Sequence, residues 1–330
     1  MIIRFGVIGA GRIGRVHAKT IAANPKAKLA YIADAVPAAA QSLADQYGAK
    51  VASVDEIMKA GDVDAVMIGS PTGFHAEHIQ AASNHGKAIM CEKPVSLSVA
   101  TIEETLKVVE KNKSTLMIGF NRRFDPNFDE LESIIRRGDI GEVEICTVIS
   151  RDPAPPSAEY AKGSGGIFAD MMIHDFDMAR FLVGEEFVIV NALGAALVDK
   201  AIGEAGDVDT AAVQMQTASG KIAVITNSRR ATYGYDQRVE VHGSKGMVHA
   251  KNVHNTTVEV LSKWGYKADL IQNFFLERYG AAYANELNTF ITAVETGKRD
   301  PKPNGFDGLQ AQRLAEAAKQ SWQTGKPVKV

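Results

Sequence analysis

The chain has 330 residues, enough for about two domains, and its 45% hydrophobic and 23% charged residues are ordinary for a folded globular protein. Its 37 basic and 39 acidic residues give a net charge of −2 without any block of like charges, which argues against a nucleic-acid-binding surface. Two cysteines, Cys91 and Cys146, exclude a disulfide framework, and no apolar run reaches the ~20 residues of a membrane span, so we expect a cytoplasmic protein.

The first third of the chain alternates short apolar segments with helical patterns. Strands that are apolar on both faces and separated by helices indicate a parallel sheet covered on both sides, which is a doubly wound α/β fold of the Rossmann type. We assign this domain to residues 1–122. The predicted strands are 3–8, 28–33, 63–68, 88–91 and 116–119, and the predicted helices are 12–23, 36–47, 75–85 and 99–111.

Strand-like segments follow one another directly in the rest of the chain, residues 123–330. Tight turns at 218–220 and 243–246 indicate antiparallel neighbours. We predict an α+β domain with an open, mainly antiparallel sheet, whose last helix returns to the first domain. The predicted strands are 143–151, 188–197, 210–217, 221–228, 237–242 and 258–263, and the predicted helices are 128–137, 169–182, 281–295 and 309–323.

An open sheet has two faces, and the predicted helices suffice to cover one of them. Alternating apolar residues at Val213, Met215, Ile222 and Val224 are expected on the other face. An exposed apolar face of this kind is typical of a subunit interface. We therefore expect a homo-oligomer formed through the open face.

A glycine motif stands where the first predicted strand turns into the first predicted helix. Gly9 would permit a tight turn, Gly11 the close approach of a pyrophosphate and Gly14 close packing of helix and strand. Asp34 ends the second strand, where a carboxylate binds ribose hydroxyls and repels a 2′-phosphate, so NAD is favoured over NADP. The predicted cofactor contacts of this region are Gly9, Gly11, Arg12, Ile13, Gly14 and Asp34.

Polar residues also follow the third and fourth long strands at the edge where ligands bind in open α/β sheets. Ser70 and His75 come after the third strand, and we expect both to contact the cofactor, His75 in a capping or cofactor-edge role. His75 and His78 are too isolated to indicate a metal site. After the fourth strand, Glu92 and Lys93 reach the same edge, where Lys93 can donate to a substrate oxygen as a fixed cation.

A glycine-rich loop at 163–166 leads into the predicted helix 169–182. Asp170, His174 and Asp177 recur at i, i+4 and i+7 and would share one face of that helix. Their neighbours are apolar, and buried polar groups must be satisfied, so the polar stripe is expected to face a cavity with polar partners. The segment has no further His or Cys at a spacing that would complete a metal site, and we expect no bound metal.

These motifs resemble those of the Gfo/Idh/MocA oxidoreductases over the whole chain. The resemblance rests on the glycine motif 9–14, on Glu92-Lys93-Pro94, and on Gly165-Gly166 followed by Asp170 and His174. Within the family, the stretches 119–125, 173–180 and 228–238 are similar to those of bacterial inositol 2-dehydrogenases.

The resemblance implies roles for individual residues of this sequence. Lys93, Asp170 and His174 would form the catalytic group, and Lys93 would touch both the cofactor and the substrate. Arg123, Asp177 and Tyr235 would line a polyol pocket with them. Tyr233 is an alternative to Tyr235, and Tyr279 and Tyr283 are further aromatic candidates. Glu92 is expected beside the cofactor.

The implied activity is NAD-dependent oxidation of the C2 hydroxyl of myo-inositol to a ketone, a step of inositol catabolism, with His174 as general base. Relatives are often tetramers. One alternative is a dehydrogenase of another polyol or an aldose, such as scyllo-inositol or glucose. A second alternative, from another functional class, is a non-catalytic NAD-binding regulator, which would have no need of both Lys93 and His174.

Overall fold

The computed structural model describes residues 2–330, which form two compact units. The first unit comprises the chain up to Phe124 together with Ala281–Gln312, and the second comprises Asp125–Gly280 together with Arg313–Val330. The chain therefore returns to the first unit near its end, and the last long helix is divided between the two units. Within residues 2–330, no helix combines the length and the apolarity needed to cross a membrane. The domain boundary at residue 122 stays a prediction.

The first unit is built on a six-stranded sheet in which all neighbouring strands are parallel. The strand order β3-β2-β1-β4-β5-β6 reverses between β1 and β4, which is the topological switch point of a doubly wound fold. The predicted Rossmann fold is confirmed. The strands are β1 (Ile3–Ile8), β2 (Ala27–Ala33), β3 (Lys50–Val51), β4 (Ala65–Ile68), β5 (Ala88–Glu92) and β6 (Leu116–Gly119).

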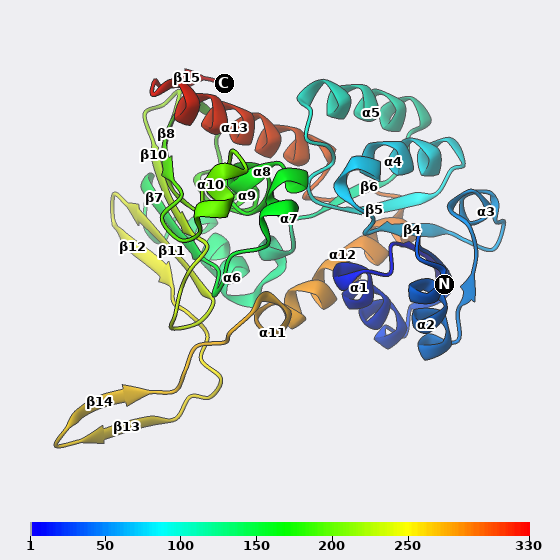
Figure 1. The fold of residues 1–330 in the computed structure, drawn as a ribbon, viewed down its shortest axis with the longest axis horizontal. Coiled ribbons are helices and arrows are strands. Elements are labelled where there is room, and N and C mark those ends of the chain that lie inside the picture. The colour runs from blue at the N-terminus through cyan, green and yellow to red at the C-terminus, as the bar shows by residue number, and fades with distance from the viewer. Residues whose placement is uncertain (1) are drawn as a thin grey trace. The chain divides into compact units, whose positions relative to one another are not determined.

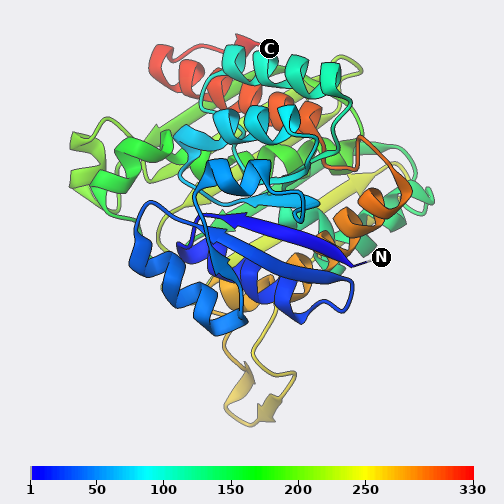
Figure 2. The same cartoon turned by 90° about the vertical axis from the view of Figure 1, so that its right-hand side faces the viewer.

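Helices cover both faces of this sheet because its strands are apolar on both sides. In Figures 1 and 2, α4 and α5 lie on one face, and α1, α2 and α12 lie on the other. The late helix α12 completes the core of this unit, where Phe290 packs against Phe5 with ring centroids 6.0 Å apart. The helices are α1 (Arg12–Ala23), α2 (Pro37–Tyr47), α3 (Val54–Lys59), η1 (Thr72–Phe74), α4 (His75–Asn84), α5 (Val99–Asn112), η2 (Asn121–Phe124) and α12 (Gly280–Thr296).

The second unit contains a seven-stranded sheet in the order β12-β11-β7-β10-β9-β8-β15. Every neighbouring pair is antiparallel except β7 and β10. The turns predicted at 218–220 and 243–246 join β9 to β10 and β11 to β12. The strands are β7 (Val143–Arg151), β8 (Phe187–Ala195), β9 (Thr210–Thr217), β10 (Ile222–Ser228), β11 (Asp236–Gly243), β12 (Gly246–Ala250) and β15 (Val328–Lys329).

One face of the second sheet is covered by helices of the same unit. Helix α13 is joined to the backbone of β8, where Ser321 accepts a hydrogen bond from the Ala192 amide at 2.9 Å and the Trp322 indole donates to the Gly194 carbonyl at 3.1 Å. The helices are α6 (Pro126–Arg136), α7 (Ala158–Ser164), α8 (Gly166–Asp170), α9 (Ile173–Val183), α10 (Lys200–Glu204), α11 (Phe275–Arg278) and α13 (Gly305–Thr324).

The prediction of a single helix over 169–182 is wrong, because the chain forms two helices, α8 and α9, with a break at Met171 and Met172. The Met172 amide donates to the carbonyl of Ile167, five residues earlier, instead of the i−4 carbonyl of a continuous helix. The prediction that Asp170, His174 and Asp177 share one face of one helix therefore fails for Asp170. It holds for the other two, which are both on α9.

The predicted composition of the open sheet face also needs correction. Val213 and Met215 are buried on the helix-covered face, because their partners in the β9–β10 register, Ile225 and Ala223, point to the same side. Ile222 and Val224 lie on the open face as predicted, opposite Gln216 and Gln214. Successive residues of a strand point to opposite faces of the sheet. Alternation in the sequence therefore shows which residues of one strand share a face, but not whether that face is the open or the helix-covered one.

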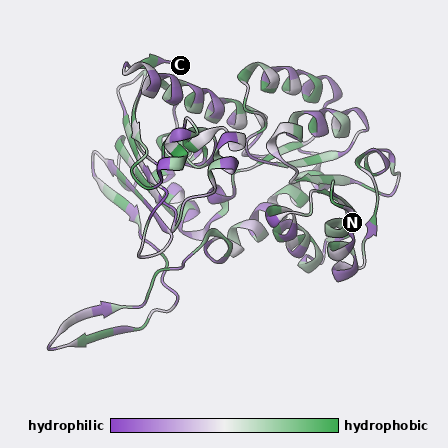
Figure 3. Cartoon of the chain, in the orientation of Figure 1, coloured by the Kyte–Doolittle hydropathy of each residue, from purple (hydrophilic) through white to green (hydrophobic). Residues whose placement is uncertain are grey.

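A two-stranded arm leaves the second unit after β12 (Figure 1). It consists of β13 (Glu259–Ser262) and β14 (Gly265–Ala268), of which only the first was predicted. Figure 3 shows hydrophobic residues along β13. Leu261 is 77% exposed and Trp264, in the turn, is 86% exposed. A hairpin of two strands has no core of its own, so these side chains remain uncovered within the chain.

Candidate active site

The turn between β1 and α1 brings three backbone segments into contact. Gly9 has a φ of +106°, and a Cβ there would lie 2.4 Å from the Gly69 carbonyl oxygen after β4. A Cβ at Gly14 would lie 1.9 Å from the Gly9 carbonyl oxygen. Nothing lies within 4 Å of a Cβ built on Gly11, which caps the N-terminus of α1. The helix terminus is thus open, and its amide groups can bind an anion.

Asp34 follows β2 and ties this turn to the neighbouring strand end. One carboxylate oxygen accepts a hydrogen bond from the Ala10 amide at 2.6 Å, and the other accepts from the Val36 amide at 2.8 Å. A carboxylate has about four lone-pair sites, so both oxygens keep acceptor capacity. Asp34 therefore fixes the glycine turn and can still accept hydrogen bonds from a ribose, a double role that sequence reasoning had not foreseen.

His75 holds together the chain segments that follow β4 and β5. Its Nε2 lies 2.7 Å from the Ser70 carbonyl oxygen and its Nδ1 lies 2.7 Å from the Pro94 carbonyl oxygen. His75 is buried, and the peptide bond between Lys93 and Pro94 is cis. The ring nitrogens are thus directed to the backbone, and the cofactor contacts of Ser70 and His75 stay predictions.

His78, a residue not expected to bind a metal, is half-buried on α4. Its Nδ1 lies 3.0 Å from the Ser70 hydroxyl, and burial lowers the pKa of the imidazole. Within residues 2–330, no group of three or more His, Cys, Asp or Glu residues is arranged to hold a metal ion.

Glu92 and Lys93 stand at the end of β5 with different surroundings. The Glu92 carboxylate is buried and lies 2.7 Å from His17 Nε2 on α1, while Lys93 is partly exposed. Sequence reasoning assigned Glu92 to the cofactor and overlooked His17. A histidine three residues after Gly14 falls on the buried side of α1, and this was the only available signal for it.

Arg123, expected to contact substrate, belongs to the first unit. It lies in η2 directly after β6, and its guanidinium donates to the Asp307 carboxylate of α13 at 3.1 Å. Both side chains are buried. Asp307 also accepts from the Asn304 amide at 2.8 Å. The role of Arg123 toward substrate stays a prediction.

In the second unit, Asp170 is held by two side chains from other elements. Its carboxylate accepts from the Tyr160 hydroxyl of α7 at 3.1 Å and from the Arg229 guanidinium at 3.1 Å. Arg229 is buried and also lies 3.8 Å from Asp152. Arg229 and Tyr160 are thus members of this cluster that sequence reasoning missed as site residues, because both come from elements other than that of Asp170.

His174 and Asp177 differ in exposure although both are on α9. His174 is partly exposed, as is Asp170, whereas Asp177 is 1% exposed and lies 3.8 Å from Arg180. The neighbouring Asp175 is also buried and accepts from the Asn227 amide of β10 at 2.8 Å. Asp170 and His174 are therefore the two predicted site residues of this region that reach the surface of the unit.

Tyr235 and Tyr233 have separate environments. Tyr235 is buried edge-on against Tyr279, with ring centroids 6.0 Å apart. Tyr233 is half exposed, and its hydroxyl donates to Asp236 at 2.6 Å. Tyr283 lies in the first unit, where its ring stands against His17 at 5.5 Å.

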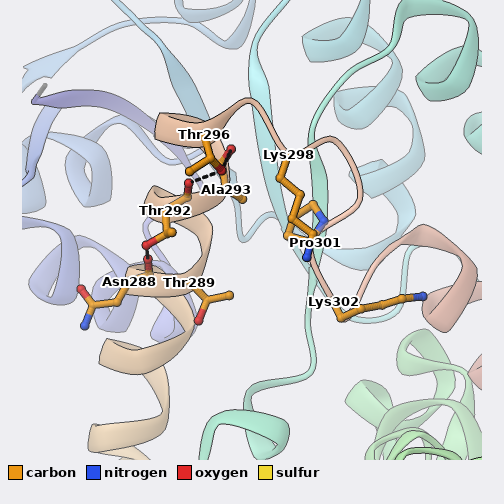
Figure 4. Close-up of a pocket in the computed structure, with 8 residues that line it drawn as sticks. All are labelled: Asn288, Thr289, Thr292, Ala293, Thr296, Lys298, Pro301 and Lys302. Carbon is orange, nitrogen blue, oxygen red and sulfur yellow. Dashed lines mark hydrogen bonds between the residues drawn. The ribbon is translucent and has the colours of Figure 1, made fainter.

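A shallow pocket of about 390 Å³ lies beside α12 and contains none of the predicted site residues (Figure 4). The hydroxyls of Thr292 and Thr296 donate to carbonyls one turn earlier on the same helix, at 2.9 Å and 2.8 Å. Because these donors are already used, the pocket offers little convergent polar chemistry.

Comparison with known proteins agrees with this geometry. Residues 3–120 match the model described as the oxidoreductase family, NAD-binding Rossmann fold, and residues 132–330 match that of the oxidoreductase family, C-terminal alpha/beta domain. The chain belongs to the Gfo/Idh/MocA oxidoreductase family. The predicted family is thereby confirmed, as are the NAD cofactor and the class of NAD-dependent dehydrogenase.

Several members of the family are similar over their full length. An inositol 2-dehydrogenase of Rhizobium meliloti is 54% identical over 97% of both chains. A solved myo-inositol dehydrogenase from Corynebacterium glutamicum is 44% identical, with a TM-score of 0.95 over 100% of this chain and 99% of that chain. A scyllo-inositol dehydrogenase from Lactobacillus casei, solved with NAD(H) and scyllo-inositol, is 31% identical, with a TM-score of 0.93 over 100% and 99%.

The first unit fits the NAD of this family. The open space over Gly11 suits a pyrophosphate at the N-terminus of α1, and Asp34 stands at the next strand end. These are the residues that would hold the cofactor.

We expect alanine substitutions at Gly11 and Gly14 to have different effects. Gly14→Ala should lower the free energy of unfolding by about 1–3 kcal/mol, because the new Cβ collides with the Gly9 carbonyl. Gly11→Ala should keep the stability of the wild type, since its Cβ meets nothing, yet weaken NAD binding. Urea unfolding and a fluorescence titration with NAD measure the two effects.

Gly61→Ala is the matched control, since nothing lies within 4 Å of its added Cβ either. It should change neither quantity. Normal NAD affinity in Gly11→Ala would contradict the placement of the pyrophosphate at this turn.

Proposed function

We propose that the protein oxidises the C2 hydroxyl of myo-inositol to 2-keto-myo-inositol (scyllo-inosose) with NAD. The observation that carries this proposal is full-length similarity, at 54% identity, to an inositol 2-dehydrogenase. The charged residues of the second unit support it, because Asp170 and His174 reach its surface from an otherwise buried segment. Such a pair suits a substrate rich in hydroxyl groups.

In this proposal the chain contributes a base, a cation and an orienting carboxylate. NAD, when bound, supplies the acceptor for the hydride. His174 takes the proton from the substrate hydroxyl as general base. The Lys93 ammonium group stabilises the alkoxide that develops on the substrate oxygen. Asp170, itself held by Tyr160 and Arg229, orients the hydroxyl or the imidazole.

Three further residues are proposed to contact the substrate. Arg123, Asp177 and Tyr235 are candidates for contacts with the remaining hydroxyls. Tyr235 is favoured over Tyr233, because the Tyr233 hydroxyl already donates to Asp236.

A second candidate substrate is scyllo-inositol, which a 31% identical relative binds together with NAD(H). The same Lys93, Asp170 and His174 could act on either isomer. The alternative of a non-catalytic NAD-binding regulator is set aside, because the dehydrogenase class is confirmed.

Initial rates of NADH formation test the substrate and the cofactor together. We expect turnover of myo-inositol with NAD⁺ to exceed that of scyllo-inositol and glucose, and NADP⁺ to be a poor substitute. Asp34→Ser should relax the cofactor preference, because it removes the charge that would repel a 2′-phosphate. Preference for another polyol would keep the enzyme class and discard myo-inositol, while NAD binding without turnover of any of the three would contradict the proposed substrates.

His174→Ala should lower kcat by about 10²–10⁴-fold, the usual contribution of a general base, while leaving NAD affinity near the wild-type value. Steady-state kinetics at saturating myo-inositol and an NAD titration measure both quantities. His85→Ala, at the exposed end of α4, is the matched control and should have normal kcat. An unimpaired His174→Ala variant would remove His174 from the proposed role.

We also propose a cytoplasmic homotetramer formed through the open face of the second sheet. On that face Leu193 is 68% exposed and Ile222 is 38% exposed, and the arm adds Leu261 and Trp264 to the uncovered apolar surface. Apolar surface of this extent is typical of protein interfaces. Cys91 and Cys146 are free thiols, which fits a reducing compartment.

Leu193→Asp should dissociate the oligomer, because a charge would be buried in the interface without a partner. Sedimentation velocity at micromolar concentration should show the mass of an oligomer for the wild type and a smaller species for the variant. Ile2→Asp, at an exposed apolar position of the first unit, is the control and should sediment like the wild type. A monomeric wild type would refute the proposal.

A further inference from the structure

Glu286 lies on α12 at a wholly buried position that the proposed reaction does not use. Its exposed fraction is 0%, and neither carboxyl oxygen has a hydrogen-bond partner. Leu287, Phe290 and Ile291 of the same helix belong to the hydrophobic core. A buried polar group without a partner costs free energy, so packing alone would favour an apolar side chain here.

The charge that acts on Glu286 is that of Glu92, which is paired with a histidine of another element. Glu92 ends β5, and its carboxylate lies 2.7 Å from Nε2 of His17 on α1. A carboxylate only accepts hydrogen bonds, so His17 Nε2 is the donor. Tyr283, one turn before Glu286, sets the edge of its ring against the His17 imidazole. Space around Glu92 is tight, since a Cβ at Gly119 would lie 3.1 Å from its carboxylate.

A carboxyl group that is buried without a hydrogen-bond donor favours its neutral form. Glu92 has a hydrogen-bond donor in His17, whereas Glu286 has none. Burial, and then the charge of Glu92, raise the pKa of Glu286 well above its usual range. Glu286 is therefore a neutral acid in the apolar interior. We refer to His17, Glu92 and Glu286 as the buried cluster.

The buried cluster joins the two parts of the first unit that the reaction depends on. His17 is on α1, whose N-terminus carries the glycine turn. Glu92 immediately precedes Lys93, and His75 holds the Pro94 carbonyl on the other side of that lysine. The backbone on both sides of Lys93 is thus held by buried side chains.

We propose that the buried cluster is a positioning device for Lys93. His17 fixes Glu92 and thereby the direction in which Lys93 leaves the strand, while neutral Glu286 avoids repelling Glu92. This inference rests on the proposed function, in which Lys93 is catalytic. His17 is a positioning residue, because it acts through Glu92 and not on the substrate.

A double-mutant cycle with Lys93 tests the inference in the full-length enzyme. We expect His17→Leu to lower kcat on the order of 10²-fold, as a displaced reacting group does, with NAD affinity near the wild-type value. In a Lys93→Met background, the same substitution should have little further effect. His17→Gln, which keeps an N–H donor, should restore most of the lost kcat, and His85→Leu is the matched control.

The outcomes separate this inference from the proposed function. Equal losses from His17→Leu in both backgrounds would mean a general structural role and would overturn the inference alone. Normal kcat in Lys93→Met would overturn the catalytic role of Lys93 and the inference with it. If His17→Leu does not fold, Glu92→Gln replaces it in the same cycle with the same expectations.

The neutral state of Glu286 has its own measurement, the pH dependence of the unfolding temperature. Above the ordinary value of 4.5 the unfolded chain loses this proton, while the folded chain keeps it until its raised pKa is reached. Glu286 therefore makes stability fall as the pH rises through this window. As the pH rises from 5 to 8, the unfolding temperature of Glu286→Gln should therefore fall less than that of the wild type. Parallel curves would show that Glu286 is ionised and would overturn its assigned part in the buried cluster.

Discussion

The close approach of backbone at the β1–α1 turn is the constraint on which the first unit depends. A Cβ at Gly9 would collide with the Gly69 carbonyl, and a Cβ at Gly14 would collide with the Gly9 carbonyl. With these Cβ atoms absent, α1 lies directly against the ends of β1 and β4. That position opens its N-terminus at Gly11 and also places His17 within hydrogen-bond distance of Glu92. The same packing thus prepares the phosphate site and the strand end that carries Lys93.

In the second unit, the main constraint is that an otherwise apolar segment carries acidic side chains, which need hydrogen-bond donors. Asp170 and Asp175 flank a helix break and would each be costly alone. Arg229 and Asn227 supply the compensating donors, from β10 or the residue after it. The break between α8 and α9 lets Asp170 reach Arg229, while His174 lies in the first turn of the next helix. The predicted cavity-facing stripe is thereby replaced by two polar residues, Asp170 and His174, on separate helices.

Much of the architecture could be predicted because it follows from periodic patterns. The bounds of α1 and β9 agree with their predicted ranges, since continuous apolar segments and amphipathic helices are local signals. The break at Met172 could not be predicted, because it depends on one backbone hydrogen bond to Ile167. Contacts such as Arg229 with Asp170 depend on folding between distant segments. Short elements such as β15 exist only through pairing with β8.

Several buried ionisable residues of the first unit lie at or after the carboxyl ends of its strands. His75 follows β4, Glu92 ends β5, and Arg123 follows β6, each with a polar partner. Buried ion pairs contribute little net stability, and a well-packed apolar side chain would often serve as well. The apolar sheet and α12 therefore supply the stability, and the charged groups lower it at one edge. Because ligands bind at that edge of a doubly wound sheet, this distribution is better explained by the placement of site residues than by folding.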